Sequence, residues 1–312
     1  MTFIRAELQA LAGGEAADDR DPADGEEPAA ITVDIPGGVA LSRVTKRGRP
    51  PFNVAVVHGG PGAAGEMAPV AEELASGCGV LEPIQTAASL NGQVCELRAA
   101  LETAGDPPLT LIGFSWGAWL GFILAARYPE LVHKLILVGS GPFEDEYVPQ
   151  VHQTRLQRLN PAERVEFDAL IEGLADRRGA DGNELLQRLA ALTLKCDAYD
   201  PLPGAADLAA GATLDAEIFH NVWTEAAELR RTGELLEHAG RIRCPVVAVH
   251  GDHDPHPADG VRLPLSSRLD AFRFVLLEKC GHKPWIERHA RDAFYRILRA
   301  AVRDPHARRV NP

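Results

Sequence analysis

A serine flanked by two glycines, at the junction of an apolar strand and an apolar helix, limits the possible folds of this chain more than any other part of its sequence. The pattern Gly113-Phe-Ser115-Trp-Gly117 directly follows the run Leu109–Ile112 and directly precedes the run Ala118–Tyr128. A tight strand-to-helix turn exposes a serine hydroxyl above a sheet, but it crowds the neighbouring backbone, so glycines are needed on both sides. The pattern therefore predicts a nucleophilic Ser115 at the carboxyl end of a buried strand.

The same stretch could be mistaken for a membrane span. Residues Leu109–Ala126 carry no charge and are about long enough to cross a bilayer. Gly113, Ser115 and Gly117 interrupt the middle of the stretch, and Pro107-Pro108 stand just before it. These residues favour a buried strand, a sharp turn and a buried helix, and we expect no association with a membrane.

Apolar strand-like runs alternate with helical patterns along most of the chain. The runs are rich in β-branched residues and apolar on both faces, as in parallel strands that are covered by helices on each side. The alternation predicts an α/β protein with a mostly parallel central sheet. The predicted strands are Val54–His58, Leu109–Phe114, Leu135–Val138, Val246–His250 and Phe274–Leu277, and the predicted helices are 64–76, 89–104, 116–128 and 284–302.

Two segments depart from this alternation. Residues 142–240 contain no strand-like run, and Asn160-Pro-Ala-Glu163 has the residues of a capped helix start. With further helical patterns at 183–195 and 214–238, the sequence predicts a helical cap insertion at 142–240 in a core of residues 31–141 and 241–304. Residues 1–30 hold eight acidic and two basic residues and few large apolar ones, so we expect a disordered acidic tail.

Charge and cysteine usage exclude several classes of protein. The formal net charge of −12 argues against binding to nucleic acid or to an anionic membrane surface, since both need clustered Lys and Arg. The five cysteines are widely spaced and form no C-x-x-C pattern, so we expect neither a disulfide framework nor a structural zinc site. Arg5 and Glu7 interrupt the N-terminal apolar run, which lacks a secretory pattern, and we expect a reducing, cytoplasmic location.

A second glycine-rich motif, His58-Gly-Gly-Pro-Gly62, ends the strand Val54–Val57. Acyl transfer needs backbone N–H donors that point at the developing oxyanion. Trp116, the residue after the nucleophile, should supply one of these donors, and the glycine-rich loop should supply the other. Pro61 has no N–H group, so Gly60 is the predicted donor, and His58 is expected to hold the loop in place.

An acid and a base should follow the nucleophile along the chain, because this type of site has the order Ser, acid, His. Asp254 follows the strand Val246–His250 and is the predicted acid, with Asp252 as the alternative. His282 follows the next strand, and from a loop at its end it can reach Ser115 as a general base. The acid is needed to orient the imidazole and to stabilise its charged form.

A cluster of histidines and aspartates raises the alternative of a metal site. Pro255 and Pro257 interrupt the cluster, so its members do not share a helix face, and we expect no metal and no cofactor. Cys280, near His282, has no base of its own and is expected to contribute only packing. The cluster consists of His250, Asp252, His253, Asp254 and His256.

With these motifs in place, residues 31–302 resemble an α/β-hydrolase, and the motifs are similar to those of the proline iminopeptidase branch. The resemblance implies a Ser/Asp/His hydrolase with a cap domain. It assigns the nucleophile, the acid and the base to Ser115, Asp254 and His282, and the oxyanion donors to Gly60 and Trp116. The chain departs from that branch in Leu81-Glu-Pro-Ile-Gln-Thr-Ala-Ala-Ser89, which lacks the branch's Arg and Gly, and in an elbow that begins Gly-Phe. These departures indicate a divergent subgroup.

The sequence thus predicts a serine hydrolase that cleaves a small ester or amide through an acyl-enzyme. Two alternatives stay open: an acyltransferase that uses the same triad, and a non-catalytic ligand-binding member of the fold. The segment 142–240 leaves the sheet beside the catalytic groups and should cover them. Its nineteen acidic and nine basic residues would favour a substrate with a free amino group, as in an aminopeptidase, unless they lie on solvated helix faces.

Overall fold

The computed structural model describes residues 30–35, 39–176, 179–205 and 213–303. The predicted acidic tail of residues 1–30 lies outside the described residues except for Ala30, where the first strand begins.

A single large sheet runs through the described residues, with the strand order β1-β2-β5-β3-β6-β7-β9-β10. Strand β2 is antiparallel to both β1 and β5, and all the other neighbouring pairs are parallel. The prediction of a mostly parallel sheet is therefore confirmed. The strands are β1 (Ala30–Ile35), β2 (Val39–Arg47), β3 (Phe52–Val57), β5 (Gly79–Ile84), β6 (Leu109–Phe114), β7 (Val132–Val138), β9 (Val246–Gly251) and β10 (Phe272–Leu277).

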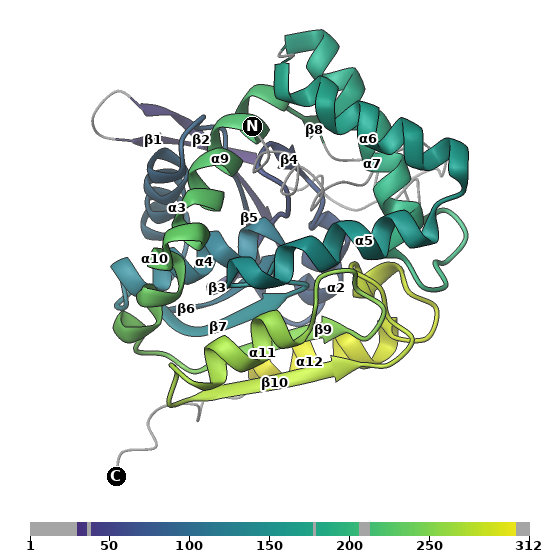
Figure 1. The fold of residues 1–312 in the computed structure, drawn as a ribbon. Helices are drawn as coiled ribbons and strands as arrows, with labels where there is room; N and C mark the ends of the chain where they lie inside the picture. Colours follow the sequence, from purple (N-terminus) through teal and green to yellow (C-terminus); the bar gives the residue numbers. More distant parts are fainter. Residues whose placement is uncertain (1–29, 36–38, 177–178, 206–212, 304–312) are drawn as a thin grey trace.

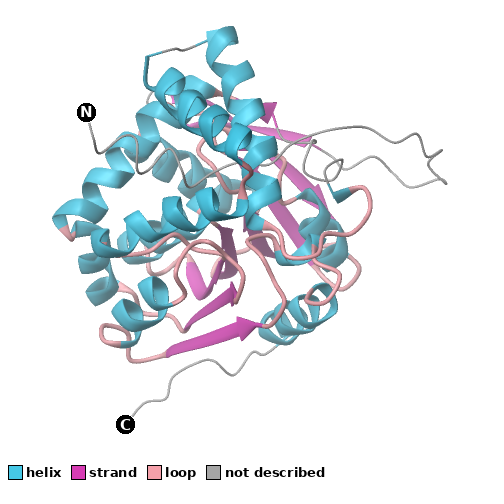
Figure 2. Ribbon diagram, turned by 45° about the vertical axis from the view of Figure 1, so that its right-hand side comes forward, coloured by secondary structure: helices cyan, strands magenta, loops and turns pink. Residues whose placement is uncertain are grey.

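Helices cover both faces of the sheet, as Figure 2 shows. Successive side chains of a strand point to opposite faces. In β3, Ala55 and Val57 belong to one buried apolar cluster, and Val54 and Val56 belong to the other. The first cluster is closed by helices α3 (Leu90–Ala104), α4 (Trp116–Arg127) and α11 (Asp259–Ser266), and the second by α2 (Ala68–Ala75) and α12 (Arg291–Arg303).

Some elements differ from the sequence predictions. The pattern did not predict β1, β2 or β5, because β2 carries Ser, Arg, Thr and Lys, and β5 contains Glu82 and Pro83. Helix α12 begins at Arg291 rather than at residue 284, because Pro284–Ile286 forms a separate 3-10 turn, η4. Helix α11 was also not predicted.

The segment 142–240 is mainly helical, as predicted, and its helices α5, α6 and α7 lie together on the right of Figure 1. Asn160 caps α6: its side chain accepts the N–H groups of Ala162 and Glu163, while the Glu163 carboxylate accepts the Asn160 N–H. The predicted helix 214–238 is divided at Gly233, which has a positive φ of 84°. The helices are α5 (Val148–Arg158), α6 (Pro161–Asp176), α7 (Gly179–Asp197), α9 (Ala216–Thr232) and α10 (Glu234–Glu237).

A two-stranded sheet joins this segment to the glycine-rich loop. Strand β4 (Ala63–Ala64) pairs with strand β8 (Thr213–Leu214), and the Asp215 N–H donates to the Gly62 carbonyl at 3.0 Å. The sequence predicted no strand in the segment, since a two-residue strand has no recognisable pattern. The pairing connects the loop that follows β3 to the start of α9.

Buried contacts also hold the helical segment in place. Trp223 of α9 stacks on Trp119 of α4, with ring centroids 5.5 Å apart. Arg155 of α5 and Asp197 at the end of α7 form a buried two-bond ion pair, with N···O distances of 2.8 and 2.5 Å. No described helix is long and apolar enough to cross a bilayer. All five cysteines lie in the described part of the chain, and all are free.

Candidate active site

Ser115 lies in the sharp turn between β6 and α4, as the sequence predicted. Its backbone has φ 51° and ψ −114°, a conformation that non-glycine residues rarely adopt. The turn is held by the Ser115 N–H, which donates to the Val138 carbonyl at 2.9 Å. Strain of this kind is typical of functional sites, where the surrounding structure enforces it.

The two flanking glycines are required by space. A Cβ atom on Gly113 would lie 2.1 Å from the Gly117 carbonyl oxygen. A Cβ atom on Gly117 would lie 2.4 Å from the carbonyl oxygen of His58. The glycines therefore allow α4 to pack directly against the ends of β3 and β6.

His282 is oriented by Asp254. The imidazole Nδ1 donates to Asp254 Oδ2 at 2.7 Å, and both side chains are buried. Asp252, the alternative acid, is exposed and accepts the backbone N–H of Cys280 instead. Of the two aspartates, Asp254 is thus the one that contacts the predicted base.

A second histidine binds the same carboxylate. His256 donates to Asp254 Oδ1 through its Nδ1 at 2.7 Å and through its backbone N–H at 3.0 Å. Burial lowers the pKa of His256 to about 4. Burial alone would raise the pKa of Asp254, but the adjacent His282, His256 and His250 favour the ionised form and hold that pKa well below its usual value.

A metal site, the alternative weighed from the sequence, would use the same side chains. Possible ligand atoms of Asp254, His256 and His282 lie within 4.8 Å of one another. The Nδ1 atoms of both histidines are already hydrogen-bonded to the Asp254 carboxylate, and His250 Nε2 contacts the His256 carbonyl at 2.8 Å. The arrangement fits a hydrogen-bonded acid and base. Cys280 is buried in an apolar cluster, and burial raises the pKa of its thiol.

The loop that carries His282 is fixed from several sides. The His282 backbone N–H donates to the Asp197 carbonyl at 2.9 Å, and the imidazole ring packs on Phe114 with ring centroids 4.8 Å apart. Gly139, at the end of β7, has φ 50°, and a Cβ atom there would lie 3.1 Å from His282 Nδ1. The buried Glu287 carboxylate accepts the Gly281 N–H at 2.8 Å.

The glycine-rich loop reaches the same place. Gly60, with φ 28°, lines a pocket beside Ser115. Trp116 is the first residue of α4, where a helix leaves its N–H groups without intrahelical acceptors. His58 Nδ1 donates to the Gly59 carbonyl at 2.7 Å, so this histidine does contact the loop that it was expected to hold, and burial lowers its pKa.

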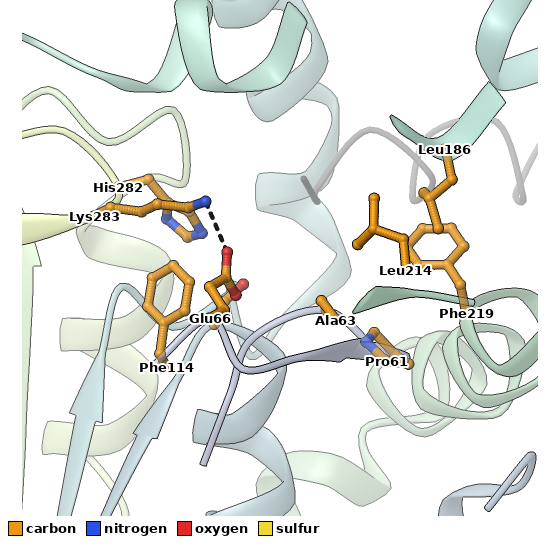
Figure 3. Close-up of a pocket in the computed structure, with 11 residues that line it drawn as sticks. Pro61, Ala63, Glu66, Phe114, Leu186, Leu214, Phe219, His282 and Lys283 are labelled. Carbon is orange, nitrogen blue, oxygen red and sulfur yellow. Dashed lines mark ion pairs between the residues drawn. The ribbon is translucent and has the colours of Figure 1, made fainter. Parts of the chain in front are cut away.

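One pocket is lined by both Ser115 and His282. Its two sides differ in character (Figure 3). One side carries His282, Lys283 and Glu66, and the opposite side is apolar. Apart from Phe114 of β6, which lies on the same side as His282, the apolar lining comes from segment 142–240 and from the loop after β3: Leu186, Leu214, Phe219, Pro61 and Ala63.

The polar side contains a buried ion pair. Lys283 Nζ lies 2.7 Å from Glu66 Oε1, and the two side chains are only 4% and 6% exposed. Lys283 directly follows His282, and Glu66 lies between β4 and α2. The pair therefore links the loop of the predicted base to the loop of the predicted oxyanion donor.

The chain also matches a protein-family model. The model describes the alpha/beta hydrolase fold and matches residues 92–288, which include Ser115, Asp254 and His282. This chain belongs to the α/β-hydrolase family. The family membership that the sequence motifs suggested is thereby confirmed.

Among curated proteins, this hydrolase is similar to pimeloyl-[acyl-carrier protein] methyl ester esterases of Neisseria meningitidis. The relative from serogroup A / serotype 4A is 25% identical over 219 residues, which are 67% of this chain and 63% of that protein. The relative from serogroup B / serotype 15 is 24% identical over 228 residues, which are 71% of this chain and 76% of that protein. The match thus spans less than two thirds of the first relative's length.

Several solved structures share the fold of this hydrolase. VinJ has a TM-score of 0.65 and 19% identity, over 88% of this chain and 99% of VinJ. A proline iminopeptidase of Mycobacterium smegmatis has a TM-score of 0.55 and 18% identity, over 88% of this chain and 98% of its own. An enol-lactonase from Burkholderia xenovorans LB400 has a TM-score of 0.56 and 18% identity, over 88% and 100%. At these identities the likeness concerns the fold alone.

Sequence reasoning missed several residues around the site. Glu66 and Lys283 gave a usable signal, since each is a charged residue within four positions of a predicted catalytic motif. Gly139 and Asp197 gave none, because their contacts with His282 arise only when distant parts of the chain pack together. His256 was considered only as a metal ligand, and its bonds to Asp254 give it a different place in the site.

Proposed function

We propose that this α/β-hydrolase is a serine esterase that cleaves small, largely apolar esters through an acyl-enzyme. The observation that carries the proposal is that Ser115 and His282 line one pocket while His282 is hydrogen-bonded to the buried Asp254. A hydroxyl, an imidazole and a carboxylate in this order are the components of a nucleophilic triad.

In the proposed reaction, His282 takes the proton from the Ser115 hydroxyl as its oxygen attacks the ester carbonyl carbon. The N–H groups of Gly60 and Trp116 stabilise the negative charge on the carbonyl oxygen. His282 then gives its proton to the departing alcohol, which leaves an acyl group on Ser115. Water, activated by the same imidazole, releases the acid.

The lining of the pocket favours an ester over an aminoacyl amide. An aminopeptidase needs a carboxylate to hold the free amino group of its substrate. Among the described lining residues the one carboxylate is Glu66, and Lys283 already neutralises it. The residues that segment 142–240 gives to the described lining are the uncharged Leu186, Leu214 and Phe219. The names of the curated relatives support an ester substrate as well.

A fluorophosphonate probe tests the nucleophile directly. Wild type should be labelled, and the labelled peptide should contain Ser115, whereas the Ser115→Ala variant should stay unlabelled. Labelling of neither protein would favour a non-catalytic binding protein.

A panel of 4-nitrophenyl esters and aminoacyl 4-nitroanilides tests the substrate class. We expect kcat/KM to be higher for uncharged alkanoyl esters than for every aminoacyl anilide. A preference for a free α-amino group, lost on N-acetylation, would contradict the esterase proposal and favour the aminopeptidase. Product analysis with added alcohols separates hydrolysis from acyl transfer.

A further inference from the structure

The ion pair between Lys283 and Glu66 lies inside the pocket where the chemistry is proposed to occur. Both residues line this pocket together with Ser115 and His282, and Lys283 is the residue after the predicted base. Figure 3 shows the ammonium and the carboxylate on the same side of the pocket as His282, across from the apolar side chains of Leu214 and Phe219.

A buried ion pair usually adds little to the free energy of unfolding. The desolvation of two charges costs several kcal/mol, and their attraction often no more than offsets it. Apolar residues of similar volume would serve the packing of this pocket at least as well. The retention of two charged side chains, each nearly fully buried, therefore calls for a role in binding.

The ammonium group has unused hydrogen-bonding capacity. A lysine ammonium has three N–H donors. Lys283 Nζ contacts Glu66 Oε1, and it has no further acceptor among the described residues. A buried donor without an acceptor is costly, so a substrate atom that supplies an acceptor gains binding energy at this position.

The charge of the pair restricts that acceptor. Lys283 and Glu66 together are neutral, so a substrate carboxylate would gain the ammonium but would also face the Glu66 carboxylate. A substrate ammonium would face Lys283. An uncharged oxygen meets neither repulsion and accepts a charge-assisted hydrogen bond.

We propose that Lys283, neutralised by Glu66, is a specificity-determining residue whose ammonium binds an uncharged oxygen acceptor of the substrate, such as an amide or ester carbonyl or a hydroxyl. The inference deepens the proposed esterase function and rests on it. With the opposite apolar side of the pocket, it describes a substrate that has an apolar body and one neutral acceptor near the scissile ester.

The test uses 4-nitrophenyl esters whose acyl chains end in a methyl, a primary amide, a carboxylate or a trimethylammonium group, over a series of chain lengths. At the best length we expect wild type to prefer the amide-ended ester over the methyl-ended one by about tenfold or more in kcat/KM. The carboxylate and trimethylammonium esters should both be poorer than the amide.

The variants then assign this preference. In Lys283→Met the amide-to-methyl ratio should fall to about one, because the donor is gone. In Glu66→Gln the carboxylate ester should gain about tenfold or more relative to the amide, because the ammonium is no longer neutralised. Lys195→Met is the matched control, since Lys195 is exposed and pairs with Glu163 away from the pocket, and it should keep the wild-type ratios.

An unchanged amide-to-methyl ratio in Lys283→Met would overturn the proposal. An equal loss of kcat/KM on all four esters, together with slower fluorophosphonate labelling, would also overturn it, since this is the result expected of a purely structural pair. The double variant Glu66→Gln/Lys283→Met removes both charges and shows whether a single variant fails by unfolding.

Binding to Ser115→Ala separates this inference from the esterase proposal. Calorimetry with the amide-ended and methyl-ended esters measures the preference without any turnover. A tighter amide complex that depends on Lys283 supports the inference even if wild type hydrolyses none of the esters, a result that would defeat only the esterase proposal. Equal affinities overturn the inference.

Discussion

Asp254 and Asp252 are two residues apart, yet only the Asp254 carboxylate contacts His282. We expect Asp254→Asn to lower kcat on a 4-nitrophenyl ester by a factor on the order of 10³ or more, because an amide cannot stabilise the imidazolium. Asp252→Asn should stay within a few-fold of wild type, since that side chain is exposed. The assignment of the acid is wrong if Asp252→Asn is the inactive variant.

His256 gives the site a measurable dependence of stability on pH. Its pKa is lowered to about 4 in the folded state, whereas an unfolded histidine has a pKa of about 6.5. Between these values the unfolded chain binds the additional proton, so stability falls as the pH drops below 6.5. At pH 5 this loss amounts to about 2 kcal/mol for a single group.

The variant His256→Gln should therefore lose less unfolding free energy than wild type between pH 7.5 and pH 5, by about 2 kcal/mol. Urea denaturation at the two pH values measures the difference. Burial also lowers the pKa of His152, which lies on α5. The variant His152→Gln therefore provides a comparison at a second histidine. If wild type and His256→Gln lose the same unfolding free energy between pH 7.5 and pH 5, His256 is not kept neutral by the fold.

Single residues were predictable where their chemistry comes with a local pattern. Glycines, a strand and the chain order mark Ser115 and His282, and Gly60 and Trp116 followed from the same motifs. The roles of these four residues as nucleophile, base and oxyanion donors stay predictions. The contacts of Glu66 with Lys283 join positions 217 residues apart, and no local pattern specifies such a pair.

At the scale of whole elements, the end of β7 determines where the predicted base can lie. Gly139 has a positive φ, and a Cβ atom there would lie 2.8 Å from the His282 carbonyl oxygen and 3.1 Å from Nδ1. We expect Gly139→Ala to displace the imidazole and to lower kcat by about 10²-fold, the typical cost of a small misplacement. The rate of ester hydrolysis at saturating substrate measures this change in kcat.

Gly240 supplies the control for that substitution. A Cβ atom on Gly240 meets nothing within 4 Å, so Gly240→Ala should leave both kcat and the melting temperature near wild type. If Gly139→Ala lowers the melting temperature but not kcat in the folded protein, the glycine serves folding and not the position of His282.

Strands in the middle of the sheet were easier to predict than strands at its edge. Strands β6 and β7 are almost wholly buried, and each contains an uninterrupted apolar run, Leu111–Phe114 and Leu135–Val138. Strand β2 carries Arg43, Lys46 and Arg47 because it lies nearer the edge and pairs in the antiparallel direction. A polar sequence of this kind has no continuous apolar run, so β2 could not be predicted from periodicity.

At the scale of the molecule, the Arg155–Asp197 pair joins two helices of segment 142–240 next to the His282 loop. We expect Asp197→Ala to lower the free energy of unfolding by about 3–5 kcal/mol, because it leaves a buried guanidinium without its partner. Replacement of both residues, in Arg155→Met/Asp197→Leu, should recover much of that loss.

Arg188 of α7 forms an exposed ion pair with Glu166 of α6 and serves as the reference. Arg188→Ala should change the free energy of unfolding by less than about 1 kcal/mol in the same denaturation experiment. An effect of Asp197→Ala no larger than this would mean that the buried pair adds nothing to the attachment of the segment. The division of the chain into a core and a cap at residues 142 and 240 stays a prediction.

The pairing of β4 with β8 restricts how this protein could be recombined with its relatives. Ala63–Ala64 belong to the loop of the predicted oxyanion donor, and Thr213–Leu214 belong to the helical segment, but each strand has only the other as its neighbour in that small sheet. The Asp215 N–H also donates to Gly62, where an added Cβ atom would lie 2.7 Å from the Asp215 carbonyl oxygen. A chimaera that imports a foreign helical segment should therefore import the matching residues 62–64 with it. The unit to exchange in this hydrolase is therefore discontinuous in sequence, because the helical segment and the loop of the predicted oxyanion donor have to be inherited together.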